Sequence, residues 1–290
     1  MQQLVNGIAN GCIYGALALA LVLIYRCTQF VNFAQGEMAT MSTYLVWSLT
    51  TLGLGIWPAF LIAVVASMAV GALLYRLVFK RFGVDDHLAL VIVAIGLFFI
   101  FNGLTQFLFG ADGQAMPAMF PTSVIDLAGV RVPAAVLGVL GVLAAVSVAL
   151  WAMFKHTRVG LGFRAVASNQ DSSSLSGLPV RRLLGAGWAL AAGLGTLAGC
   201  LLTALGVFLN PNMMVSVLVY AFAAATLGGL DSPAGAVTGG LLLGVLESLA
   251  AAYVPVIGSD LKLAVAFVVL VLVMLIRPTG LFGRQVVVRV

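Results

Sequence analysis

The chain has 290 residues, of which 62% are hydrophobic and only 8% are charged, and its mean hydropathy is +1.17. This composition excludes a water-soluble globular domain, and in a chain so apolar the net charge of +5 does not indicate nucleic-acid binding. Apolar runs long enough to cross a hydrocarbon core of about 30 Å recur along the chain. Because they lack period-two alternation, the sequence predicts an all-α, polytopic membrane protein in a single domain, residues 1–290, with about eight or nine segments, some short or broken.

Nine apolar segments are expected in chain order. They cover residues 4–25, 38–54, 58–79, 88–109, 132–154, 183–208, 214–227, 234–253 and 261–276. Whether residues 38–54 and 214–227 cross the membrane completely stays open, because both segments are short. Gly7, Gly11 and Gly15 recur every fourth residue, and small residues recur again within residues 234–253. Such spacing predicts faces on which helices approach one another closely.

The distribution of positive charge predicts the orientation. With the N-terminus outside and nine crossings, only Arg131 and Lys262 of the fourteen Lys and Arg residues face outward. The opposite orientation would place the large majority of these residues outside, against the positive-inside rule. We therefore expect an external N-terminus and a cytoplasmic C-terminus.

One long polar interval, residues 155–182, separates the fifth and sixth segments. It carries five Lys and Arg residues, Arg158 and Arg164 among them, and basic loops of this kind lie on the cytoplasmic side. We interpret it as a coupling loop, a docking surface for a soluble partner that supplies energy. The alternative is a solvated loop that lies against lipid headgroups.

Local signals within this interval predict a short helix over residues 170–176, preceded by a basic turn or helix over residues 158–168. Asp171 and the serines after it can accept hydrogen bonds from free N–H groups at a helix start. Gly177 is expected to adopt the left-handed conformation that closes a helix, with Leu178 and Pro179 enforcing the stop.

Two acidic residues are candidates for the transport pathway. Glu247 is the only acid inside a predicted span, and a lone carboxylate at that depth is a functional candidate by default. A hydrogen bond that locks Glu247 to a neighbouring helix is the structural alternative. Glu37 is expected at the start of the second span, where helix capping competes with contact to substrate.

Five further polar or aromatic residues could line the pathway. Asn32 and Gln35 fall in the predicted break between the first two spans, near the cytoplasmic side. There they either line a gate or form hydrogen bonds with nearby backbone groups. Asn102 and Gln106 share a helix face and either line the path or bond another helix. Tyr220 could meet substrate, although packing is the simpler account.

Motifs for catalysis and metal binding are missing from the sequence. It contains no phosphate-binding GxxxxGK[ST] loop and no HExxH zinc motif, and its three cysteines lack metal-ligand spacing. We expect no enzyme activity, no metal site and no cofactor bound by this chain, so ATP and Mg²⁺ would act on another subunit.

Several stretches together are similar to a known family. These are NGIANGCIYGALALALVLIY (6–25), VNFAQGEMATMSTY (31–44), TRVGLGFRA (157–165), SGLPVRR (176–182), LNPNM (209–213), ATLGGLDSPAGAVTGGLLLGVLES (225–248) and RPTGLFGR (277–284). Spread over nearly the whole chain, they resemble the membrane permease of branched-chain amino acid ABC importers, of the LivH type.

The resemblance implies partners and a place in the cell. It implies a homologous LivM-type permease, two cytoplasmic ATP-binding subunits and an extracytoplasmic substrate-binding protein, assembled in the lipid bilayer of a bacterial inner membrane, and no nucleic acid. The substrate would be a branched-chain or related small amino acid, moved by alternating access. Importers of urea, amides or small aromatic or organic acids belong to the same family. A stand-alone channel, a secondary transporter and a membrane anchor are the competing hypotheses.

Overall fold

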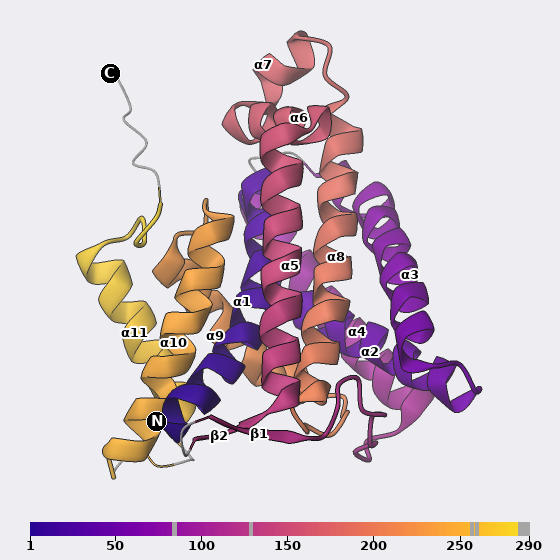
Figure 1. Cartoon of the computed structure of the whole chain (residues 1–290). Coiled ribbons are helices and arrows are strands. Elements are labelled where there is room, and N and C mark those ends of the chain that lie inside the picture. Colours follow the sequence, from indigo (N-terminus) through magenta and orange to yellow (C-terminus); the bar gives the residue numbers. More distant parts are fainter. Residues whose placement is uncertain (83–85, 128–129, 256–257, 259–260, 284–290) are drawn as a thin grey trace.

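The protein is a bundle of helices, and it is described by a computed structural model (Figure 1). The structure describes residues 1–82, 86–127, 130–255, 258 and 261–283, without the side chains of Cys27 and His87. Its helices are α1 (Gln2–Thr28), α2 (Gln35–Thr51), α3 (Ile56–Leu77), the 3₁₀ turn η1 (Phe79–Arg81), α4 (His87–Phe109), α5 (Ala134–His156), α6 (Arg158–Ser168), α7 (Gln170–Leu175), α8 (Val180–Ala204), α9 (Met213–Gly228), α10 (Pro233–Tyr253) and α11 (Lys262–Ile276). The strands are β1 (Val124–Leu127) and β2 (Val130–Pro133).

Six of these helices are long and apolar enough to cross a membrane, namely α1, α3, α4, α5, α8 and α10. Helices α2, α9 and α11 are shorter, with 17, 16 and 15 residues. The predicted polytopic α-helical membrane fold is confirmed. Met1 and the end of α11 lie at opposite ends of the bundle, as an odd number of crossings requires (Figure 1).

Helix α1 forms the centre of the bundle and is buried along most of its length, between α8, α9 and α10. The outer helices α3, α4 and α5 instead expose apolar side chains such as Leu61, Phe99 and Trp151. Since lipid is as apolar as these side chains, this arrangement is the one expected for a protein embedded in a bilayer.

The glycine faces meet where the sequence predicted close packing. A Cβ atom added to Gly11 would lie 2.7 Å from the Cα of Leu241, and one added to Gly244 would collide with the backbone of Gly11. Only hydrogen atoms therefore separate α1 from α10 along this contact. In lipid, such close approach replaces the hydrophobic effect as the source of helix association.

Helix α2 begins inside the bundle, earlier than the sequence predicted. Its first residue, Gln35, bonds the carbonyl of Ala191, which lies near the middle of α8. Residues 32–35 are thus at mid-depth, and the expectation that they lie near the cytoplasmic side was wrong. The reason is that the chain runs back from the end of α1 before α2 starts.

Helix α9 also begins within the bundle, beside the start of α2. Gly36 packs on the first turn of α9, where an added Cβ would lie 3.3 Å from the carbonyl oxygen of Met214. The amino ends of two short helices therefore meet inside the protein.

A β-hairpin at the end of the bundle next to the N-terminus was not predicted. Strands β1 and β2 pair antiparallel with Ile125 opposite Val132. The carbonyl of Arg131 accepts a 3.1 Å hydrogen bond from the side chain of Gln2, which ties the hairpin to α1. Two four-residue strands give too short a pattern to distinguish them from a loop.

Candidate functional site

Helices α6 and α7, here called the coupling hairpin (residues 158–175), project beyond the spans at one end of the bundle (Figure 1). The predicted second helix is confirmed, and residues 158–168, expected as a turn or a helix, form a helix. The Thr157 hydroxyl caps α6 by accepting from the Gly160 N–H at 3.0 Å. Asn169 caps α7 by accepting from the Ser172 N–H at 2.8 Å. Helix α7 starts at Gln170 as predicted, but the expected capping role of Asp171 was wrong, because this residue lies in the first turn and Asn169 makes the capping bond.

The coupling hairpin ends as predicted at Gly177. This residue has φ of +79°, the left-handed region that a residue with a Cβ enters at a cost of about 1–2 kcal/mol. The Leu178 N–H donates to the Ser173 carbonyl at 3.1 Å, and Pro179 then precedes α8. Helix α8 begins at Val180, three residues earlier than expected, because proline fits immediately before the first turn of a helix.

The two faces of α6 differ in character. Phe163 and Val166 are buried against the bundle, and the Phe163 ring packs edge-on against Phe154 at 5.6 Å. Arg158 and Arg164 are exposed on the other side. Apolar residues are exposed as well, with Leu161 61% and Leu175 90% accessible. Leu161 and Leu175 therefore stand outside the spans and are not covered by other residues that the structure describes.

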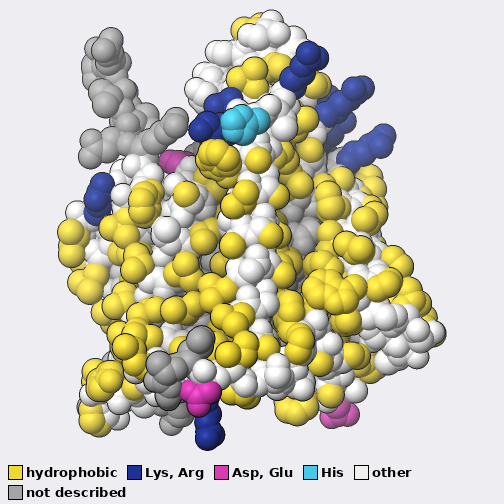
Figure 2. Space-filling model, in the orientation of Figure 1, with side chains coloured by type: hydrophobic (Ala, Val, Ile, Leu, Met, Phe, Trp, Pro, Cys, Tyr) yellow, Lys and Arg dark blue, Asp and Glu magenta, His cyan; other side chains and the backbone are white. Residues whose placement is uncertain are grey.

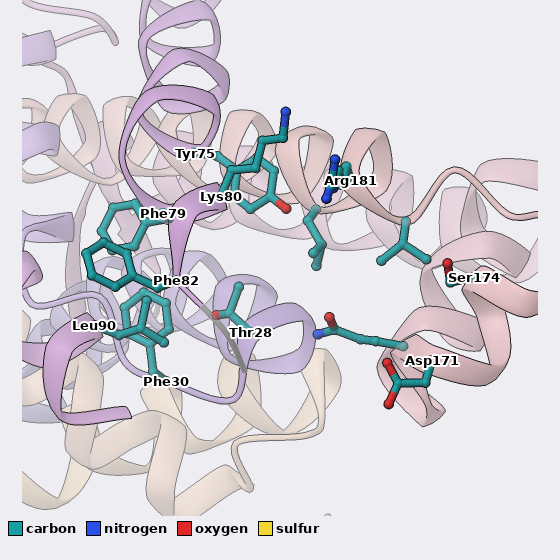
Figure 3. A pocket seen from close by; sticks show the side chains of 13 residues that line it. Thr28, Phe30, Tyr75, Phe79, Lys80, Phe82, Leu90, Asp171, Ser174 and Arg181 are labelled. Atoms are coloured by element: carbon teal, nitrogen blue, oxygen red, sulfur yellow. The ribbon is translucent and has the colours of Figure 1, made fainter. Parts of the chain in front are cut away.

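A cavity of about 290 Å³ lies between α7 of the coupling hairpin and the membrane bundle (Figure 3). On the bundle side it is lined by Thr28, Phe30, Tyr75, Phe79, Lys80, Phe82 and Leu90. On the hairpin side it is lined by Gln170, Asp171, Ser174 and the start of α8. Of the two hairpin helices, only α7 borders this cavity, because α6 is packed against the bundle through Phe163 and Val166.

A second cavity, of about 770 Å³, opens at the opposite end of the bundle. Its lining includes polar residues from three helices: Gln3, Asn6, Asn10, Ser248 and Lys262. Small residues such as Ala9 and Ala251 make up much of the rest. The bundle is thus hollowed toward both of its ends.

Glu37, Asn102, Gln106 and Asn212, here called the Glu37 cluster, meet at the start of α2 and α9. Asn102 donates from Nδ2 to Glu37 Oε2 at 3.1 Å and to Asn212 Oδ1 at 3.0 Å. Gln106 in turn donates to Asn102 Oδ1 at 2.5 Å. Glu37 is fully buried, and its side chain makes no capping bond, so the capping interpretation was wrong. The cluster joins three elements that the sequence leaves far apart.

Asn32 and Gln35 form hydrogen bonds with polar groups in and around the break between α1 and α2. Asn32 Oδ1 accepts from the Ala34 N–H at 3.1 Å, and its amide donates to Gln35 Oε1 at 3.4 Å. Gln35 Nε2 donates to the Ala191 carbonyl at 2.8 Å. Both side chains are fully buried, so in this conformation they hold backbone in place.

Glu247 lies in a different place, between α1, α9 and α10. The Tyr14 hydroxyl donates to Glu247 Oε2 at 2.6 Å, and the Tyr14 ring stacks on that of Tyr220 at 4.6 Å. All three side chains are more than nine-tenths buried. This geometry matches the interhelical hydrogen bond weighed for Glu247 and the packing role weighed for Tyr220. Sequence reasoning missed Tyr14, although it adjoins Gly15 on the glycine face of α1.

Basic residues gather at the end that carries the coupling hairpin (Figure 2). They are Arg26, Arg76, Lys80, Arg81, Lys155, Arg158, Arg164, Arg181, Arg182 and Arg277. Arg131 and Lys262 lie at the other end, beside the hairpin β1–β2 and the larger cavity. Arg284 and Arg289, which the sequence also assigned to the basic side, are outside the described residues.

The bundle has two helix breaks inside it, cavities toward both of its ends and an external helical pair. These features define the membrane domain of a transporter. The chain belongs to the family described as the permease component of the branched-chain amino acid transport system, whose model matches residues 3–274. In the described part of the chain, no three His, Cys, Asp or Glu side chains come together as ligands for a metal.

Individual relatives agree with this assignment over the full chain. The permease LivH of Salmonella typhimurium, named for high-affinity branched-chain amino acid transport, is 29% identical, with 100% of this chain and 97% of LivH covered. BraD of Pseudomonas aeruginosa, named for the same transport system, is 30% identical, with coverage of 100% and 98%. PsaBC of Streptococcus pneumoniae, solved with a Fab, shares the fold with a TM-score of 0.50 at 16% identity, over 96% of this chain and 91% of that one.

Proposed function

We propose that this protein is the pore subunit of an ATP-driven importer that moves branched-chain or related small amino acids by alternating access. Membership of the permease family and the names of the full-length relatives support the substrate class. The cavities toward the two ends of the bundle support alternating access, because each could open to one side of the membrane in turn.

The observation that carries the proposal is the coupling hairpin. It combines exposed Leu161 and Leu175 with exposed Arg158 and Arg164, and the cavity behind α7 leaves room for that helix to move. In this proposal a cytoplasmic ATPase grips the hairpin, and closure of the ATPase pair pushes it toward the bundle. Asp171, Gly177, Leu178 and Pro179 set the position of α7 and of the turn into α8 in that movement.

The remaining partners follow from the same proposal. A LivM-type permease would complete the pore, two ATP-binding subunits would dock on the cytoplasmic side, and an extracytoplasmic binding protein would deliver substrate. The basic end would face the cytoplasm of a bacterial inner membrane, with the N-terminus outside. ATP and Mg²⁺ would bind the ATPase subunits, and this chain would bind neither.

The test is ATP-driven uptake by the complete complex in proteoliposomes with variants of the coupling hairpin. Arg164→Glu and Leu175→Asp are expected to lower uptake and to weaken ATPase association. Arg131→Glu, at the opposite end, is the charge-matched control and should leave ATPase association intact.

Three results would contradict the proposal. Normal uptake by both hairpin variants at normal expression would remove the coupling role. Uptake by the purified chain alone, without ATPase subunits, would favour a channel or secondary transporter, and a complex without any substrate counterflow would favour a membrane anchor.

A further inference from the structure

The Glu37 cluster contains more hydrogen-bond acceptors than donors. Three oxygens lie within reach of the single Nδ2 group of Asn102: Glu37 Oε2 at 3.1 Å, Asn212 Oδ1 at 3.0 Å and the Pro211 carbonyl at 3.4 Å. An amide nitrogen carries only two protons, so one of these oxygens lacks a full bond. Exchanging the O and N positions of Asn102 would bring its oxygen against the carboxylate, which excludes that assignment.

Glu37 adds a further acceptor with no donor. Its Oε1 atom is buried and has no hydrogen-bond partner among the described residues. A buried carboxylate oxygen without a partner is costly, more so at membrane depth. Buried polar groups of this kind are normally satisfied, so the cluster lacks a donor that some other molecule can provide.

The cluster is open on one side. Glu37 is fully buried, but Asn102 is half-buried and Gln106 and Asn212 are exposed on the face between α4 and the start of α9. Exposed amides at this depth do not suit contact with lipid, so this face borders a water-filled path or a partner subunit. Because Glu37 is fully buried, a small polar molecule that enters from this face reaches the carboxylate only when the Asn102 side chain moves aside.

The geometry favours an N–H donor over a bare metal ion. The Asn102 amino group sits among the oxygens of the cluster, and its protons would repel a cation that tried to bind all of them. An ammonium group can instead bond the free Glu37 oxygen from the side. The amino end of α9, a 16-residue helix, adjoins the site at Asn212. Its partial positive charge suits the carboxylate group of a bound amino acid.

We propose that the Glu37 cluster binds the nitrogen end of the transported molecule, an ammonium group in the case of an amino acid, with Glu37 Oε1 accepting its N–H. This inference rests on the proposed importer function and names which group of the substrate the pore recognises. It assigns Glu37 a substrate contact, with Asn102 as the positioning residue that fixes its carboxylate.

The experiment measures binding of radiolabelled leucine to the complete permease–ATPase complex in nanodiscs, without the binding protein. Unlabelled 3-methylbutylamine, which keeps the nitrogen, and 4-methylpentanoate, which lacks it, are the competitors. The amine is expected to compete and the acid to compete poorly. Glu37→Gln should weaken leucine and amine binding by about tenfold or more, since it removes a charge-assisted hydrogen bond.

Thr105→Val is the matched control, because its buried hydroxyl bonds only its own helix, at the Phe101 carbonyl, between Asn102 and Gln106. It should leave leucine binding within about twofold. Glu37→Gln gives the cluster the donor it lacks, so the thermal midpoint of the substrate-free complex should stay the same or rise. A purely structural role for Glu37 would lower it.

Three outcomes would overturn the inference: equal competition by acid and amine, unchanged leucine binding in Glu37→Gln, or failure of that variant to assemble. Failure of the proposed function is recognised separately. In that case the wild-type complex would lack ATP-driven uptake of amino acids, whatever the Glu37 variants do.

Discussion

Tyr14 and Glu247 are 233 positions apart in the chain, yet the Tyr14 hydroxyl donates a 2.6 Å hydrogen bond to the Glu247 carboxyl group. The bond joins α1 to α10 beside the contact of their glycine faces. A buried carboxyl group in the bundle is thereby given a donor, which makes it part of the structure that holds the central helix.

Removing this donor should destabilise the bundle. Tyr14→Phe keeps the ring that stacks on Tyr220 but leaves Glu247 without the hydroxyl. The expected loss is about 1–3 kcal/mol, seen as a lower thermal midpoint of the purified complex. Tyr253→Phe, at a tyrosine that is 75% exposed, is the control and should not change the midpoint. An unchanged midpoint in Tyr14→Phe would mean that the bond contributes little.

The close contact between α1 and α10 should not tolerate a larger residue. In Gly244→Leu, the new side chain would collide with the Gly11 backbone, and we expect loss of folded protein in the membrane. Gly141→Leu on α5 meets nothing within 4 Å and should express normally. Fluorescence-detected size-exclusion chromatography compares the two variants. Equal yields would show that the helices can separate without penalty.

The turn after α7 should need glycine. Gly177→Val forces a β-branched residue to φ of +79°, with a local cost of about 1–2 kcal/mol or a shift of the coupling hairpin. We expect ATP hydrolysis with reduced uptake, measured as the ratio of transported substrate to released phosphate. Gly96→Val, at a helical glycine with open space around it, is the control. A normal ratio in Gly177→Val would argue against a role for this turn in coupling.

The orientation of the chain can be tested by labelling single cysteines. Cys12 and Cys200 are buried, so only Cys27 needs replacement by Ser to prepare the background. Ser174→Cys on α7 should react with an impermeant maleimide in inside-out vesicles, and Ser123→Cys before β1 should react in intact spheroplasts. Reversal of this pattern would place the coupling hairpin outside the cell and exclude docking of a cytoplasmic ATPase.

Much of the fold could be predicted from local sequence. The apolar lengths of α1, α3, α4, α5 and α10, the charge difference between the two ends and the two helices of the coupling hairpin each depend on residues close together in the chain. Gly177 is an example, because its left-handed conformation follows from glycine next to a proline-terminated helix. Asp171 shows the limit, since the bond that caps α7 comes from Asn169, two residues earlier in the chain.

The candidate site could be predicted only as a set of separate residues. Glu37, Asn102 and Gln106 were all singled out, but their shared hydrogen bonds and the part played by Asn212 were not. Nothing in the spacing of these residues shows that α2 and α9 begin next to each other. Tyr14 was missed for the same reason, because its partner lies on a helix near the other end of the chain.

The sequence by itself determined the lipid-embedded class, the order of the apolar segments, the charged end and the family, because hydropathy, charge and motifs are local properties. The tertiary structure alone decided which polar groups meet inside the bundle. Helix packing sets those contacts, and it depends on how glycine faces and broken helices fit together in three dimensions. An acceptor left unpaired, such as Glu37 Oε1, exists only after that fit has been made.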